Sequence, residues 1–428
     1  MNSTIGKGLR ALRRLAGADE LQETARQGVP FGRRFKANTH IHLPPNFSAF
    51  RDTKQAVELA AAQGLSVLGI SNYYDFGVYG EFAAECLAAG IFPLFGVEVI
   101  ALVDELAQRG IKVNDPGNPG KMYICGKGVS RFDRMSGDAQ RIIDKIKRSD
   151  RTRMKQMIDL LDDVFEASGI SIGLDEGAIR DAVARRTGAG RGAVTLQERH
   201  VALAFQEAFF ARVGEGERAA RLGAVFGAAP SDASDAVKVQ NDIRTHLMKA
   251  GRPAYVEEKF VSVEEASRLV LELGGIPCYP VLADGSSPIC AFEEPVERLI
   301  GQVKERDIHC VEFIPVRNEP PILERYVLAM REAGLVVTAG TEHNTLDMLP
   351  MAPACRGGRP IPEAVEDIFR EGACVVVAHE ILTLHGKVGF VDGTGAPSGS
   401  HGDRERLIGA LARMGAAVVE RAVAGQGG

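Results

Sequence analysis

Two histidines separated by a single residue, His40 and His42, lie in the segment FKANTHIHLPPNFSAF. They follow an extended stretch and precede Pro44 and Pro45, which end any regular element. In a β-strand, residues i and i+2 point to the same face, so the two imidazoles would share a face. Such a pair is either half of a metal site or two solvated side chains, and the spacing alone leaves both interpretations open.

Further polar residues stand at the ends of predicted strands. They are the residues from Asn72 to Asp75, Glu98 in FGVEV, Tyr279, and Glu342 with His343. Considered alone, Glu98 could form an ion pair with an Arg or Lys. His343 could likewise be a capping or packing residue rather than a ligand. In parallel α/β barrels, however, active residues gather at the C-terminal ends of strands. Several such residues in one barrel therefore indicate a common site.

The elements that must position these residues alternate between helix and buried strand, a pattern typical of parallel α/β architecture. Helices are predicted at 53–63, 81–90, from the Ser262–Glu265 capping box onward, at 295–306, at 320–334 and at 404–424. Strands are predicted at 65–71, 91–101, 274–282, 309–316 and 335–345. The stretch 362–386 is ambiguous, and its long pattern favours a helix. The basic N-terminal segment predicts an amphipathic helix.

The alternation stops near residue 130, and only helical patterns follow until about residue 250. They are DAQRIIDKIKRSD, RMKQMIDLLDDVFEA, DEGAIRDAVARR, LQERHVALAFQEAFFARV and DAVKVQNDIRTHLMKAG. Thr195 and Glu198 have the spacing of a capping box for the fourth pattern. The predicted organisation is an N-terminal helical segment (1–30), a barrel (31–130 and 251–400), a helical insertion (131–250) and a C-terminal helix (401–428).

Composition restricts the classes of function. The chain has 428 residues, 45% of them apolar and 25% charged, as expected for a globular protein of more than one unit. A net charge of −5 gives no basic signature for long nucleic acid, and no run of about 18 apolar residues predicts a membrane span. Seven scattered cysteines without a CxxC motif favour reduced thiols in a cytosol. The expected partner is a small-molecule substrate.

The order of the motifs resembles the PHP (polymerase and histidinol phosphatase) superfamily. HIH is followed by ISNYYD, GVE, GGIPCYP and GTEHN, over roughly residues 35–345. The resemblance implies a metal-dependent phosphoesterase on a distorted (βα)7 TIM-like barrel. The helical segment, with LQERHVALAF and HLMKAGRPAYVEEKF, is similar to the subfamily of nucleoside 3′,5′-bisphosphate phosphatases and short-RNA exonucleases.

The resemblance also implies a set of metal ligands. The first metal falls on four side chains that can all ligate: His40, His42, Glu98 and Glu342. A second metal shares Glu98 and takes His200 from the insertion, with Tyr279 where the family has a histidine. A third falls on Ser48, Tyr73 and either His343 or Asn344, and this site looks lost. We therefore expect one or two divalent ions (Mn, Zn or Fe) per chain.

Phosphoester hydrolysis of a small phosphorylated metabolite or nucleotide is the leading prediction, because the resemblance implies it. Tyr73, Tyr279 and His343 are the candidate catalytic residues, as hydrogen-bond donors or as acid and base. The two tyrosines could instead merely fill the space where a metal was lost, and the sequence leaves both interpretations open. One alternative is a metal-dependent isomerase or lyase acting on a sugar or sugar acid. Another is a binding protein without catalysis. An Arg or Lys beside the metal would favour the phosphoesterase, and a titratable Tyr or His would favour the isomerase or lyase.

Overall fold

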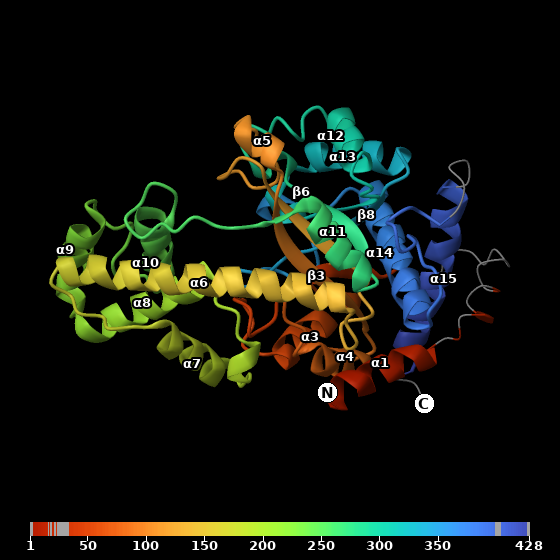
Figure 1. Ribbon diagram of the computed structural model, residues 1–428. Coiled ribbons are helices and arrows are strands. Elements are labelled where there is room, and N and C mark those ends of the chain that lie inside the picture. The colour runs from red at the N-terminus through yellow and green to blue at the C-terminus, as the bar shows by residue number, and fades with distance from the viewer. Residues whose placement is uncertain are drawn as a thin grey trace. The chain divides into compact units, whose positions relative to one another are not determined.

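The computed structural model describes residues 3–15, 17, 19–20, 23, 34–398 and 404–425 (Figure 1). The chain forms two compact units. A barrel unit comprises Met1–Leu43, Asp52–Ile143 and Phe260–Gly428, and a helical unit comprises Pro44–Arg51 and Asp144–Lys259. Of the N-terminal segment predicted at 1–30, α1 (Ser3–Leu15) is a helix, whereas most of the remainder lies outside the described residues. None of the described helices combines the length and apolarity that crossing a membrane requires.

One sheet organises the barrel unit and confirms the predicted α/β fold with a TIM-like barrel. Its strands are β1 (Lys36–Ile41), β2 (Leu65–Ile70), β3 (Phe92–Leu102), β4 (Lys121–Lys127), β5 (Val261–Ser262), β6 (Ile276–Val281), β7 (Cys310–Phe313) and β8 (Val336–Ala339). They run in the order β1-β2-β3-β4-β6-β7-β8, with β5 beside β3. A parallel bridge from Ile41 to Glu342 joins β1 to the segment after β8 and nearly closes the barrel.

All neighbouring strands in this sheet are parallel except at β4, which is antiparallel to both β3 and β6. The sequence analysis did not predict β4, because it placed the end of the alternation near residue 130 and assigned no strand there. The predicted parallel strands are confirmed by β2, β3, β6, β7 and β8. Their cores are almost continuously buried, as expected for strands covered on both faces.

Helices connect and cover these strands. They are α3 (Thr53–Ala62), α4 (Tyr79–Ala88), α5 (Asp104–Gln108), α11 (Val263–Glu272), α12 (Val296–Lys304), α13 (Pro320–Glu332), α14 (Glu363–Leu384) and α15 (Arg404–Ala424). The ambiguous segment is the helix α14, which packs along α15 (Figure 1). A Cβ on Gly415 would lie 1.9 Å from the Cys374 carbonyl oxygen, so this close packing requires glycine.

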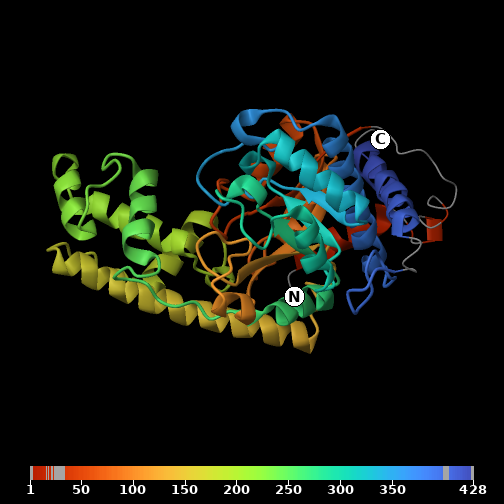
Figure 2. The same cartoon turned by 90° about the horizontal axis from the view of Figure 1, so that it is seen from above.

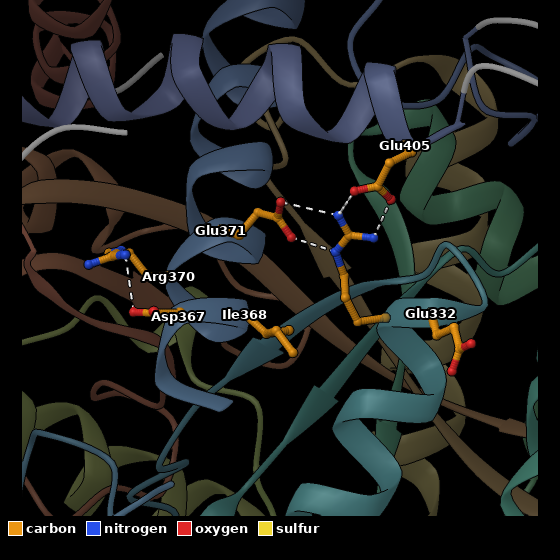
Figure 3. Close-up of a pocket in the computed structure, with 7 residues that line it drawn as sticks. Glu332, Asp367, Ile368, Arg370, Glu371 and Glu405 are labelled. Carbon is orange, nitrogen blue, oxygen red and sulfur yellow. Dashed lines mark hydrogen bonds and ion pairs between the residues drawn. The ribbon is translucent and has the colours of Figure 1, made fainter. Parts of the chain in front are cut away.

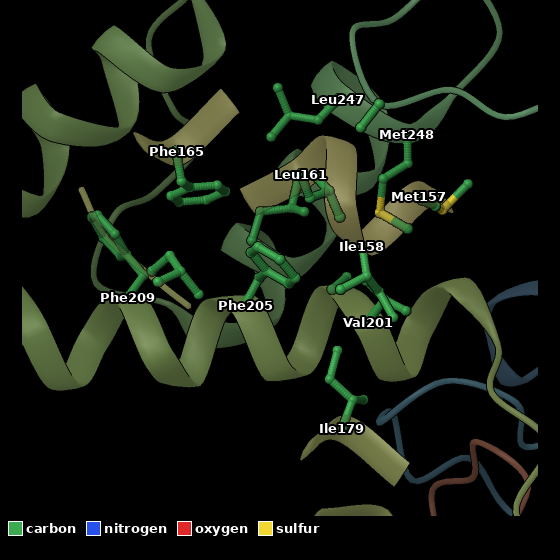
Figure 4. Close-up of a cluster of buried hydrophobic side chains, with 14 of the residues drawn as sticks. Met157, Ile158, Leu161, Phe165, Ile179, Val201, Phe205, Phe209, Leu247 and Met248 are labelled. Carbon is green, nitrogen blue, oxygen red and sulfur yellow. The ribbon is translucent and has the colours of Figure 1, made fainter. Parts of the chain in front are cut away.

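The helical unit has a hydrophobic core of its own. Its helices are α6 (Gly137–Ala167, which begins in the barrel unit), α7 (Glu176–Thr187), α8 (Glu198–Arg212), α9 (Glu215–Phe226), α10 (Ala236–Ile243) and the π-helix η2 (Arg244–Met248). Phe165, Phe205 and Phe209 meet Leu161 and Leu247 in this core (Figure 4). Burial of these large apolar side chains is the main stabilising contribution to the unit.

Three local expectations for this unit were wrong. The first two predicted helices are one continuous helix, α6 (Figure 2), because no Gly or Pro interrupts the chain between them. The helix α9 was not predicted. The N-cap of α8 is Gln197 rather than Thr195, and the capping box pairs Gln197 with His200. Val194 and Leu196 are buried, which keeps the residues around Thr195 extended and delays the start of the helix.

Candidate metal centre

Three ligating side chains converge inside the barrel. His42 Nε2 lies 3.0 Å from Glu98 Oε2, and His40 Nε2 lies 3.5 Å from the same oxygen. The two imidazole nitrogens are 3.3 Å apart. All three residues are buried, with at most 4% of any of them exposed. The structure therefore brings together three of the four side chains predicted to hold the first metal.

The backbone explains this placement. His40 lies in β1 and His42 directly after it, and the alternation of the strand turns both side chains to one face. The His40 carbonyl accepts from Thr341 N at 3.0 Å, and His42 N donates to the Glu342 carbonyl at 2.8 Å. A Cβ on Gly340 would lie 2.3 Å from the His40 Cβ. Glycine at 340 therefore allows the segment after β8 to approach the histidine pair.

A buried carboxylate orients His40. The Nδ1–H of His40 donates to Glu312 Oε2 at 2.7 Å. Glu312 Oε1 accepts from the Thr39 hydroxyl at 2.8 Å and forms an ion pair with the ammonium of Lys127. Burial opposes the ionised form, but the charges of Lys127 and His40 lower the pKa of Glu312 to about 2. A carboxylate on one imidazole nitrogen fixes the tautomer and leaves Nε2 for a metal.

A second group of possible ligands shares His40. The ligand atoms of His40, Cys125 and Glu312 lie within 4.8 Å of one another. The ammonium of Lys127 is already paired with Glu312 there, and it also donates to the Thr39 carbonyl at 3.1 Å. Despite burial, the negative charge of Glu312 raises the pKa of Lys127. A cation thus already neutralises this group, which leaves His40, His42 and Glu98 as the better metal site.

The donor set fits a divalent transition metal. Two imidazoles and one carboxylate are ligands that Zn, Mn and Fe accept in proteins. Among the described residues, Glu98 Oε2 is a buried oxygen without a well-aligned hydrogen-bond donor. Although burial would raise it, the two histidines lower the pKa of Glu98. An ionised oxygen facing two imidazole nitrogens is an arrangement that a metal ion would stabilise.

Glu342, the predicted fourth ligand, is engaged elsewhere. Its Oε1 accepts from Arg317 at 3.0 Å, and its Oε2 accepts from Arg317 at 2.5 Å and from Asn344 at 2.8 Å. Glu342 and His343 both have left-handed backbone conformations, with φ of 60° and 51°. This conformation is uncommon for residues other than glycine and is found at functional sites. The role of Glu342 as a ligand stays a prediction.

A cavity of about 350 Å³ reaches Glu98, one of these three side chains. Its polar lining includes Tyr73, Glu98, Tyr123, Arg317 and Glu342. The ring of Tyr73 stacks on His42, with centroids 5.1 Å apart and an interplanar angle of 13°. Burial, and then the charge of Glu98, raise the pKa of Tyr73 well above its usual value. The phenol is therefore protonated at neutral pH and can donate a hydrogen bond.

Two other predicted site residues have hydrogen-bond partners of their own. The Tyr279 hydroxyl donates to Glu293 at 2.8 Å, and its ring packs on Phe292. Burial raises the pKa of Glu293 to about 7. The Nε2–H of His343 donates to the Leu349 carbonyl at 2.9 Å. Neither residue lines the cavity. Their catalytic roles stay predictions.

His200 belongs to the helical unit. It is buried in the first turn of α8, where its Nδ1 accepts from Gln197 N at 3.1 Å. Its ring meets Phe47 edge-on, with centroids 5.3 Å apart. Burial, and then the charge of Arg186, lower the pKa of His200 to about 3. The imidazole is therefore neutral at neutral pH, which is the form that can bind a metal. Its role as a ligand stays a prediction.

A larger surface cavity, of about 570 Å³, carries no comparable chemistry. It is lined by residues of α13, α14 and α15 (Figure 3). Arg331 donates to both Glu371 and Glu405, so its guanidinium is occupied by two carboxylates. Asp367 accepts from Arg370 at 3.1 Å. We interpret this network as a structural link between helices.

Comparisons with known proteins support the fold. No protein-family model matches the chain, and no curated protein matches it. Among solved structures, one from Bifidobacterium adolescentis ATCC 15703, provisionally described as a metal-dependent phosphoesterase, is 14% identical with a TM-score of 0.52. The match covers 78% of this chain and 96% of that one. It shows that the two proteins share a fold.

A second solved structure is an amidohydrolase from Chromobacterium violaceum with bound sulfate and no metal. It is 18% identical to this chain, with a TM-score of 0.49. The match covers 78% of this chain and 96% of that chain.

Proposed function

We propose that this chain is a metal-dependent hydrolase that cleaves phosphoesters of small metabolites or nucleotides. The observation that carries the proposal is the convergence of His40 Nε2, His42 Nε2 and Glu98 Oε2 beside a cavity that contains Arg317. The description of the Bifidobacterium structure agrees with this class of reaction. A divalent ion held by these three residues would supply Lewis acidity and a nucleophile at neutral pH.

The remaining side chains of the cavity would bind and orient the substrate. Arg317 contributes a guanidinium to the lining of the cavity. A planar guanidinium can donate two hydrogen bonds to phosphate oxygens. The loop of Arg317 is held by Arg356, which donates to the carbonyls of Asp284 and Arg317. Tyr73, protonated and next to Glu98, would donate to a substrate oxygen. Because Glu342 now pairs with Arg317, a bound phosphate would compete with that carboxylate.

An isomerase or lyase acting on a hydroxy-carbonyl substrate is the second candidate. The buried phenol of Tyr73 stacked on His42 is the observation that favours it, since such reactions need a group that can donate a proton. The guanidinium of Arg317 in the same cavity favours a phosphorylated substrate. We therefore rank phosphoester hydrolysis first.

Phosphate release from a panel of small phosphorylated metabolites and nucleotides tests the function. We expect turnover by the metal-loaded protein and a loss of at least about 100-fold after treatment with a chelator, because the ion supplies the nucleophile. Readdition of Mn, Zn or Fe should restore the rate. Conversion of a sugar phosphate without release of phosphate would instead support the second candidate. Release that is unaffected by the chelator would exclude a metal-dependent reaction.

Replacing Arg317 tests how the substrate is bound. Arg317→Met should raise KM for the phosphorylated substrate about 10- to 100-fold, since a charge-assisted hydrogen bond is worth about 1.5–3 kcal/mol. Arg317→Lys should recover part of the loss. Arg298→Ala is the matched control, because this guanidinium donates to the Ala291 and Glu294 carbonyls and does not line the cavity. An unchanged KM in Arg317→Met would rule out a role for Arg317 in phosphate binding.

A further inference from the structure

A third cavity, of about 230 Å³, lies within the helical unit. It is enclosed by one face of α6, by α7 and by the segment that leads to α8. The lining residues are Asp144, Lys147, Arg148, Arg151, Met154, Glu176, Arg180, Gly192, Val194, Thr195 and Leu196. The cavity is therefore built from three segments of one compact unit, and none of its lining residues belongs to the metal centre.

The lining is strongly basic. Lys147, Arg148 and Arg151 follow one another on α6 at spacings that place them on neighbouring turns of one face. Arg180 adds a fourth cation from α7, against the carboxylates of Asp144 and Glu176. The cavity thus carries an excess of two positive charges.

The ion pairs at the cavity neutralise only part of this positive charge. Glu176 Oε1 is shared by Arg151 at 3.4 Å and Arg180 at 3.2 Å, so one carboxylate neutralises two cations. Within the part of the chain that the structure describes, neither Lys147 nor Arg148 forms an ion pair with a carboxylate. Cations gathered at one cavity repel one another, and this repulsion disfavours the folded unit unless an anion relieves it.

The guanidinium of Arg180 is only partly satisfied within the helical unit. Its Nη2 donates to the Arg191 carbonyl at 2.9 Å and its Nη1 pairs with Glu176. Its Nε–H is buried and meets no acceptor among the described residues. A buried donor without an acceptor costs about 1–3 kcal/mol. An oxygen-rich anion in the cavity would balance the excess positive charge to which Arg180 contributes.

We propose that this cavity binds a small phosphate-type oxyanion: orthophosphate, pyrophosphate or the phosphoryl group of a small metabolite. Guanidinium and ammonium groups are the side chains that bind such anions through charge-assisted hydrogen bonds. The limited volume favours a compact anion over the extended backbone of a nucleic acid, which needs a continuous basic track. This site is independent of the metal centre and does not rest on the proposed function.

Calorimetric titration of the full chain with pyrophosphate and with orthophosphate tests the proposal. The protein is treated with a chelator so that the metal centre cannot contribute, and the titration is repeated with His42→Ala. We expect binding in both preparations. The double variant Lys147→Ala/Arg148→Ala should weaken it about tenfold or more, since each lost charged contact is worth about 1.5–3 kcal/mol. Neither of these side chains has an ion-pair partner to lose among the described residues, so the variant should fold normally.

Lys155→Ala is the matched control. Lys155 lies on the same helix but pairs with Asp159 at 2.8 Å and does not line the cavity. Its variant should bind pyrophosphate as the unaltered chain does. The proposal is overturned if the unaltered chain binds neither anion at millimolar concentration, or if the double variant binds as tightly. It is also overturned if a single-stranded oligonucleotide binds through Lys147 and Arg148 whereas pyrophosphate does not.

Discussion

His42→Ala should abolish metal binding at the barrel centre and lower turnover by at least about 100-fold. The variant removes one of the two imidazole nitrogens that face Glu98 Oε2, and a site with only one imidazole and one carboxylate holds a divalent ion weakly. His42 is fully buried, so its loss also leaves a small cavity. We expect a stability cost of about 1–3 kcal/mol, which a folded protein tolerates.

Elemental analysis of the purified variant measures its metal content. Its circular dichroism spectrum shows whether it is folded. His385→Ala is the control, since it removes a histidine at the C-cap of α14 in the same unit. That variant should keep the metal content and the activity of the unaltered chain. If His42→Ala retains its full metal content, the ligand assignment is wrong. If the unaltered chain holds three ions, the expectation of a lost third site is wrong.

Glu312→Gln should lower both metal affinity and stability, for two separable reasons. The carboxylate that accepts from His40 Nδ1 is lost, and removal of such a partner typically costs about 10- to 100-fold in metal affinity. The ammonium of Lys127 also loses its counter-ion inside the barrel. Breaking a buried ion pair from one side costs about 3–5 kcal/mol, because an uncompensated charge remains.

The double variant Glu312→Gln/Lys127→Met separates these effects. Removing both charges should restore most of the stability, since an apolar side chain of similar length replaces the ammonium. Metal affinity should remain low, because His40 still lacks its carboxylate. Full recovery of metal affinity would mean that Glu312 acts only through Lys127. Chemical denaturation and competition with a metal indicator provide the two measurements.

Glu380→Gln is a matched control for both variants. Glu380 is also fully buried in the barrel unit, where its Oε2 accepts from Phe95 N at 2.8 Å. Burial raises the pKa of this carboxyl well above its usual value, which favours its neutral form. Its amide replacement breaks no ion pair among the described residues. We expect changes below about 1 kcal/mol in stability and no change in metal affinity.

The sequence predicted the parts of the structure that follow a regular pattern. The alternation of helix and strand indicated the barrel, and the HxH spacing with a strand-end glutamate indicated His40, His42 and Glu98. The barrel was predictable because parallel strands have long apolar runs. The ends of such strands converge at one end of a barrel, which explains why these three side chains lie together, and their role as metal ligands stays a prediction. The helical unit was recognisable for a similar reason, since its segments have clear helical periodicity.

Some of the residues that the sequence analysis missed belong to the irregular part of the sheet. Lys127 and Cys125 lie on β4, whose antiparallel pairing departs from the expected pattern. Its sequence KMYICGK alternates only briefly, although Tyr123, Cys125 and Lys127 share a face. Glu312 lay in a correctly predicted strand, and an acidic residue within an otherwise apolar run was a usable signal. Its pairing with His40 depends on contacts between distant segments, which one sequence does not reveal.

The barrel is closed by two segments, around Ile41 and around Glu342, that lie far apart in the chain. The ribosome therefore makes them at different times. His40, His42 and Glu98 all belong to the first quarter of the chain, and they leave the ribosome long before Glu312 and Gly340 do. Domains of a growing chain generally fold as units from the N-terminus onward. These three side chains are therefore open to the surrounding solution while the rest of the barrel is still being made. Once the last strands join, they are almost completely buried, and the cavity lined by Glu98 becomes the route by which an ion or a substrate would reach them.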